Sequence, residues 1–301
     1  MPRTRALPPW QVSFLLISAI WGASFMFIKV GLEGLDPLLV ALARLVLGAA
    51  TLFVLLAVMR EPLPRDRALW GRLFVVALLF NSIPFSLFSF GEQHVSSVVA
   101  GIWNATTPLF TGLFAMAWLP DERPTRHRVA GLAIGFAGVL VVLGPWRSLG
   151  GGTLLGNLLC LGPAACYGLA FIYTRRHLMG RPESFVSMSA AQVTLGTLQV
   201  AVVAPFFSSA PSHASLKVWA AMLGLGALGT GLAYVLNYDV IHRAGATTAS
   251  SVTYVVPVFA TLFGVVLLNE GLSWNEPVGA AVIIAGVATS QGMLRRATVT
   301  A

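Results

Sequence analysis

The stretch VAGIWNATTPLFTGLF (99–114) decides how the chain is organised, because its pattern returns later as TASSVTYVVPVFATLF (248–263). A shift of 149 residues places Pro108 on Pro257, and apolar residues flank both stretches. Each stretch also places polar residues beside its proline, in the middle of an otherwise apolar segment. A pattern that returns at a fixed offset indicates an internal repeat.

The repeat extends over most of the chain. The same shift lays GLAIGFAGV (131–139) over AAVIIAGVA (280–288), and a shift of 146 lays WGASF (21–25) over YGLAF (167–171). We therefore expect two related halves, residues 1–147 and 153–301.

The composition is that of a membrane protein. Of 301 residues, 56% are hydrophobic and only 10% are charged, whereas soluble domains carry about 25% charged residues. The net charge of +8 does not indicate a nucleic-acid partner, because the basic residues lie between apolar runs and form no patch interleaved with aromatic residues. The runs lack the alternation of a transmembrane β-barrel, so we expect an all-α integral membrane protein in the lipid bilayer.

A membrane-spanning helix needs about 20 mainly apolar residues. Segments of this kind, each bounded by charge, Pro or Gly, lie at 11–31, 37–59, 70–91, 95–118, 126–144, 153–174, 184–206, 216–238, 247–268 and 275–294.

The basic residues orient these ten spans. With both termini in the cytoplasm, 15 of the 19 Lys and Arg residues fall on the inner side and three on the outer side, while Arg44 lies within the second span. Five spans per half is an odd number, so the halves insert with opposite orientations. Inverted repeats of this kind are typical of secondary transporters and enclose a central cavity.

Three blocks then point to a family. WGASFMFIKV (21–30), TTPLFTGLFA (106–115) and YVVPVFATLFGVVLLNE (254–270) resemble the EamA family of the drug/metabolite transporter superfamily, and within it the YddG-type amino-acid exporters. The resemblance implies a multi-pass transporter of the cell inner membrane, a monomer or weak dimer, that works by alternating access. It suggests export of aromatic and other neutral amino acids. A drug or quaternary-amine carrier and a nucleotide-sugar carrier of the same fold are the alternatives.

The fourth and ninth spans supply the first candidate binding residues. A proline removes a helix hydrogen bond and frees the carbonyl four residues earlier, so Pro108 and Pro257 are predicted hinges. The candidates beside these prolines are Trp103, Asn104, Thr107, Thr253 and Tyr254. The alternative is that nearby Ser or Thr hydroxyls bind the freed carbonyls and the prolines only shape the helices.

Polar and aromatic residues within other spans complete the predicted substrate site: Trp21, Arg44, Asn81, Phe85, Tyr167, Gln192, Tyr234 and Asn237. Their alternative role is packing and hydrogen bonding between helices. Arg44 in particular either meets a substrate carboxylate or pairs with an acidic residue near the outer ends, Glu33, Asp36 or Glu92.

No carboxylate is predicted at mid-bilayer. Many family members carry Glu just before the proline of the fourth and ninth spans, where this chain has Thr107 and Val256. Proton relays in membranes usually need an acidic residue or His, so we expect facilitated export without strong proton coupling. The five His residues all lie at span ends or in loops, no phosphate-binding loop is present, and Cys160 and Cys166 have no nearby ligand cluster. The sequence therefore predicts neither an enzyme nor a metal or other cofactor.

Overall fold

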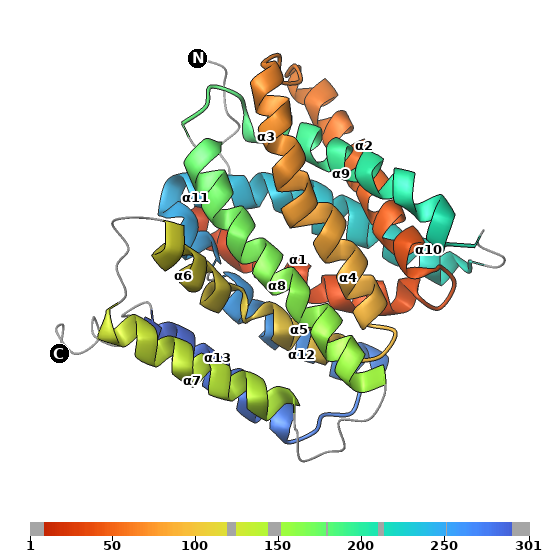
Figure 1. Cartoon of the computed structure of the whole chain (residues 1–301). Coiled ribbons are helices and arrows are strands. Elements are labelled where there is room, and N and C mark those ends of the chain that lie inside the picture. The colour runs from red at the N-terminus through yellow and green to blue at the C-terminus, as the bar shows by residue number, and fades with distance from the viewer. Residues whose placement is uncertain are drawn as a thin grey trace.

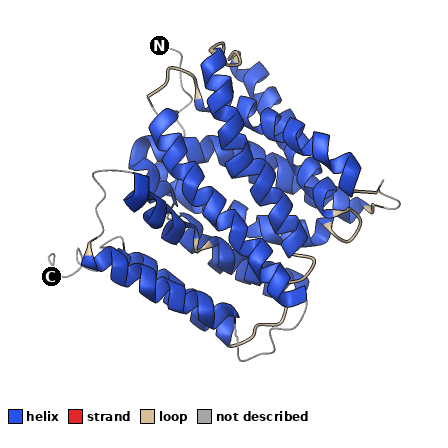
Figure 2. Ribbon diagram, in the orientation of Figure 1, coloured by secondary structure: helices blue, strands red, loops and turns tan. Residues whose placement is uncertain are grey.

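The computed structural model describes residues 9–118, 125–143, 152–178, 180–209, 214–250 and 252–290, and every regular element within these ranges is a helix (Figure 2). The elements up to residue 143 are α1 (Trp10–Gly31), α2 (Pro37–Met59), α3 (Arg67–Ala77), η1 (Leu78–Ser82), α4 (Ile83–Gly91), α5 (Ser97–Asn104), α6 (Thr107–Trp118) and α7 (Arg126–Leu143). The later elements are α8 (Gly152–His177), α9 (Phe185–Phe207), α10 (Leu216–Leu223), η2 (Gly224–Leu232), α11 (Ala233–Ser250), α12 (Val252–Leu268) and α13 (Asn275–Ser290).

Helices occupy all ten predicted ranges, although residues 144, 251 and 291–294 of three predicted spans lie outside the described residues. Among the described residues, seven continuous helical segments are long and apolar enough to cross a membrane, and Val129–Val142 and Val252–Leu268 are shorter apolar helices. The seven are Trp10–Gly31, Pro37–Met59, Arg67–Gly91, Ser97–Trp118, Leu154–His177, Phe185–Phe207 and Leu216–Ala244. The chain is thus a multi-pass, all-helical membrane protein over its described part.

The third and eighth predicted spans each contain a π-helix, which the sequence analysis did not predict. Element η1 joins α3 to α4, and η2 joins α10 to α11. The 149-residue shift carries η1 onto the middle of η2. A π-helix widens the backbone and is often found at functional sites.

The fourth predicted span is interrupted, and its proline acts differently from its counterpart. Helix α5 ends at Asn104, and Pro108 lies in the first turn of α6, where a missing N–H costs little. The hydroxyl of Thr107 donates to the Asn104 carbonyl at 2.8 Å, so that carbonyl is occupied within the chain. By contrast, Pro257 lies inside the continuous helix α12. The prediction that Pro108 leaves the Asn104 carbonyl free is therefore wrong.

Helices from the first half of the sequence pack against helices from the second half. Helix α1 packs against α12, α2 against η2 and α9, and α8 against α4 and α6. Glycines allow these approaches: Gly22 lies against Phe259 and Ala260, while Gly168 lies against Phe110 and Thr111. The two contacts correspond under the shifts of the sequence repeat. Gly168 lies 146 residues after Gly22, while Phe110 and Thr111 lie 149 residues before Phe259 and Ala260.

Helices α7 and α13 pack side by side along one edge of the molecule (Figure 1). Their glycines face each other: a Cβ at Gly138 would lie 2.7 Å from the Ile283 nitrogen, and one at Gly286 would overlap the Gly135 backbone. The small residues of these helices thus serve packing within the chain, as small residues commonly do between membrane helices.

We expect Gly286→Ala to lower the free energy of unfolding by about 1–3 kcal/mol, because the added methyl group separates α7 from α13. Gly71→Ala is the matched control, since nothing lies within 4 Å of its would-be Cβ and alanine favours a helix by about 1 kcal/mol. Thermal unfolding in detergent measures both variants. Equal melting temperatures would contradict the close α7–α13 packing.

Candidate functional site

A cavity lies at the centre of the helix bundle, with an empty volume of about 510 Å³ that includes its opening to solvent. Residues from both halves of the chain line it. They are Trp21, Ser24, Phe25, Ile28, Arg44, Phe80, Phe85, Phe88, Asn104, Tyr167, Phe171, Tyr234 and Thr253.

Aromatic rings make up most of the cavity wall. Phe80, in η1, is the centre of this group: its ring centroid lies 5.0 Å from that of Phe171, 5.6 Å from Tyr167 and 6.4 Å from Tyr234. Trp21 meets Tyr234 edge-on at 6.4 Å. Rings packed in this way form a stiff apolar surface with hydroxyl and indole groups at its margin.

Arg44 is the cation of the cavity lining. Helix α2 carries it into the bundle, where only 5% of the residue is exposed. Its Nε donates to the Thr230 hydroxyl at 2.9 Å and its Nη2 to the Gly229 carbonyl at 3.3 Å. The guanidinium carbon lies 3.6 Å from the centroid of the Phe85 ring, a cation–π contact.

Two small residues and a π-helix create this position. A Cβ at Gly48 would lie 2.7 Å from Thr230, and one at Gly226 would lie 2.9 Å from the Arg44 carbonyl, so glycine lets α2 approach η2. The Gly229 carbonyl accepts from the Trp21 indole at 3.2 Å as well as from Arg44. The loosened backbone of η2 thus presents an acceptor to the cavity.

A second layer of polar side chains supports Tyr234 from behind. The Tyr234 hydroxyl donates to the Phe80 carbonyl at 2.9 Å and accepts from the Asn81 amide at 3.0 Å. Gln192 donates to Asn81 at 2.7 Å and accepts from the Tyr238 hydroxyl at 2.7 Å. The chain of hydrogen bonds joins η1, α9 and α11, and it fixes one cavity wall.

Seven of the thirteen predicted binding residues line the cavity: Trp21, Arg44, Phe85, Asn104, Tyr167, Tyr234 and Thr253. The others lie elsewhere. Asn81 and Gln192 belong to the supporting layer, Thr107 binds its own helix, Tyr254 is half-buried on α12 and Asn237 is buried on α11. Trp103 is fully buried, and its indole donates to the Asn157 side chain at 2.7 Å, so it packs α5 against α8.

Six lining residues were not predicted: Ser24, Phe25, Ile28, Phe80, Phe88 and Phe171. Helical spacing was an available signal for most of them. Ser24, Phe25 and Ile28 follow Trp21 by three, four and seven positions and so share its face. Phe80 has no such signal, because the π-helix changes the periodicity there.

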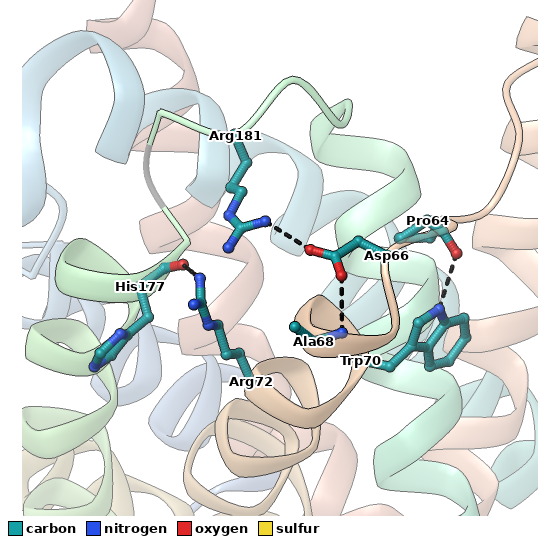
Figure 3. Close-up of polar contacts among 7 residues, drawn as sticks. All are labelled: Pro64, Asp66, Ala68, Trp70, Arg72, His177 and Arg181. Atoms are coloured by element: carbon teal, nitrogen blue, oxygen red, sulfur yellow. Dashed lines mark hydrogen bonds and ion pairs between the residues drawn. The ribbon is translucent and has the colours of Figure 1, made fainter.

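At the end of the bundle that is predicted to be cytoplasmic, Asp66 and Arg181 join the two halves. The Arg181 Nη1 and the Asp66 Oδ2 lie 2.9 Å apart. Figure 3 shows the two side chains directed at each other, with Arg72 donating to the His177 carbonyl nearby. The Ala68 N–H and the Arg181 guanidinium hold the pKa of Asp66 below its ordinary value. The ion pair is therefore present at neutral pH and is lost only as pH falls through that lowered pKa.

At the opposite end, Glu270 joins the halves by capping α5. Its carboxylate accepts from the Ser97 N–H at 2.9 Å, the Ser97 hydroxyl at 2.7 Å and the Val98 N–H at 3.2 Å. Lys29 donates to the Glu92 and Val95 carbonyls at 2.6 and 2.9 Å. Glu92 is fully buried, and its carboxylate makes no hydrogen bond within the part of the chain that the structure describes.

Known proteins resemble this chain over nearly its whole length. The model of the EamA-like transporter family matches residues 9–144 and again residues 154–290. The "uncharacterized transporter YoaV" of Bacillus subtilis is 26% identical over 280 residues, which cover 92% of this chain and 94% of that protein. The "uncharacterized inner membrane transporter YedA" of Escherichia coli is 28% identical, covering 95% and 91%.

A solved crystal structure shares the fold. It superposes with a TM-score of 0.70 at 19% identity, covering 95% of this chain and 98% of the other. At this identity the likeness concerns the fold alone.

We expect Trp103→Ala to reduce the free energy of unfolding by about 3–5 kcal/mol, because it empties a fully buried site. Trp118→Ala is the matched control, since Trp118 is 52% exposed at the end of α6, and it should cost less than about 1 kcal/mol. Thermal unfolding in detergent gives both values. A stable, folded Trp103→Ala protein would place this indole outside the core.

Proposed function

The chain belongs to the EamA-like transporter family, and on that premise we propose that it exports small metabolites, above all aromatic and other neutral amino acids, across the cell inner membrane. The observation that carries the proposal is the central cavity, which combines aromatic walls with one guanidinium and a few uncharged polar groups. Small-molecule sites are typically apolar with a few placed polar groups.

The proposed architecture is two five-helix repeats, residues 1–147 and 153–301, inserted with opposite orientations and with both termini in the cytoplasm. Paired contacts support it. At a shift of 148 residues Arg44 and Gly48 correspond to Gln192 and Gly196, and both pairs meet equivalent partners. Arg44 and Gly48 contact Thr230, whereas Gln192 and Gly196 contact Asn81, 149 residues earlier.

The proposed mechanism is alternating access, and two connections between the halves support it. The cavity lies between two connections that join the halves, Asp66–Arg181 at one end and Glu270 with the start of α5 at the other. Breaking one connection while the other holds would open the cavity to one side at a time. The break between α5 and α6 before Pro108, and Pro257 within α12, are the proposed hinges.

The cavity suits a free amino acid better than the alternative cargoes. The Asn104 side chain lines it and makes no hydrogen bond to the described residues, so its amide is available to a substrate that would otherwise leave polar groups unpaired. A nucleotide-sugar would favour several cations, and Arg44 is the single Lys or Arg among the described lining residues. A quaternary amine would face the charge of Arg44.

We propose facilitated export rather than strong proton coupling. Neither Asp nor Glu occurs among the lining residues that the structure describes. Glu92 is a buried carboxylate near the outer end. If a pH gradient were found to drive transport, loss of that effect in Glu92→Gln would identify Glu92 as the proton-binding group.

In proteoliposomes, we expect saturable exchange of labelled phenylalanine, and Asn104→Ala should reduce it at least about fivefold because the free amide is lost. Gln93→Ala, an exposed amide outside the cavity, is the matched control. Unchanged exchange by Asn104→Ala would remove this residue from the site. Uphill uptake driven by an imposed pH gradient would overturn facilitated export.

We expect a reversible cross-link between Asp66→Cys and Arg181→Cys to stop exchange, because both ends cannot then open in turn. Cys160 and Cys166 are first replaced by alanine, and a short bifunctional methanethiosulfonate is used as the cross-linker, because the aspartate and arginine side chains that meet here are longer than cysteine. Reductant should restore exchange. Full exchange by the cross-linked protein would exclude movement at this connection as part of the transport cycle.

A further inference from the structure

Arg44 is a buried cation without an ion pair among the described residues. A guanidinium has five N–H donors, and the structure assigns two, one on Nε to Thr230 and one on Nη2 to the Gly229 carbonyl. The remaining donors belong to the two terminal nitrogens of a side chain that lines the cavity.

The guanidinium is held in a fixed orientation. The Thr230 and Gly229 contacts lie on one side of it, and the Phe85 ring lies 3.6 Å from its carbon. A planar group held in this way binds a carboxylate through two parallel hydrogen bonds at little cost in side-chain entropy. Its free donors are therefore pre-organised for a planar anion.

The described residues around Arg44 offer it no carboxylate within hydrogen-bonding distance. Tyr167 and Tyr234 line the same cavity, and phenols carry no charge at neutral pH. The buried carboxylate of Glu92 makes no hydrogen bond to Arg44. No carboxylate occurs among the described lining residues. An unpaired charge among apolar helices is costly, so a bound anion would satisfy what the protein leaves unsatisfied.

We propose that Arg44 binds the carboxylate of the transported molecule, and that the cavity selects aromatic monocarboxylates by this group without requiring an amino group. The inference rests on the proposed transport function and names the chemical feature that the site recognises. An amino acid would be accepted through its carboxylate, while its ammonium would meet only rings, hydroxyls and the Asn104 amide.

Three compounds with the same phenylethyl group separate these roles. Phenylalanine carries both charges, 3-phenylpropanoate only the carboxylate and phenethylamine only the ammonium. Binding is measured as thermal stabilisation of the purified wild-type protein, which does not depend on transport. We expect 3-phenylpropanoate to bind at least as tightly as phenylalanine, and phenethylamine at least about tenfold more weakly than either.

Arg44→Gln should abolish the preference for the two carboxylates, and Arg65→Gln, which removes an exposed charge outside the cavity, should retain it. The inference would be overturned if phenethylamine bound as tightly as phenylalanine, or if neither phenylalanine nor 3-phenylpropanoate bound. The wild-type comparison is decisive even if Arg44→Gln fails to fold.

Exchange in proteoliposomes, corrected for leakage into empty vesicles, tests the proposed function separately. Carboxylate binding without exchange would support the anchor and reject transport of these compounds. Exchange of phenylalanine by a protein that binds phenethylamine as tightly as phenylalanine would support transport and reject Arg44 as the carboxylate anchor.

Discussion

The arrangement of the cavity depends on one constraint: a guanidinium placed among apolar helices must have its donors satisfied by the protein, by water in the cavity or by a ligand. Within a helix bundle, water reaches only the groups that line such a cavity. The neighbours of Arg44 stabilise part of this group. Gly48 and Gly226 let α2 approach η2, the Gly229 carbonyl accepts one hydrogen bond, and the Phe85 ring contacts the guanidinium.

The π-helices meet the same constraint from the backbone side. A regular α-helix uses its carbonyls internally, whereas η2 turns the Gly229 carbonyl toward both Trp21 and Arg44. Element η1 provides the Phe80 carbonyl, which accepts from Tyr234. The widened turns thus supply acceptors at the depth where side chains from both halves meet, without charged residues of their own.

The sequence was sufficient to predict an all-helical membrane protein and about half of the described cavity lining, and the physical reasons differ. Hydropathy places helices well, because each spanning segment must be apolar over about 20 residues. Polar or aromatic type alone brought Trp103 into the predicted site, although its indole is satisfied by Asn157 inside the core. Composition does not say which way a polar group points, and the local changes at η1, η2 and Ala105–Thr106 shift the helical faces that spacing would predict.

The two halves use equivalent positions in unequal ways. Gln192 corresponds to Arg44 at a shift of 148 residues. Its amide donates to Asn81 and accepts from Tyr238. It has become part of a hydrogen-bonded wall, whereas Arg44 retains free donors toward the cavity. Both positions join helices from the two halves of the sequence, but the amide of Gln192 is satisfied by the protein, whereas the guanidinium of Arg44 keeps donors for what enters the cavity. Binding of an anion would therefore act on the contact between α2 and η2, whereas the hydrogen bonds around Gln192 are complete without a ligand.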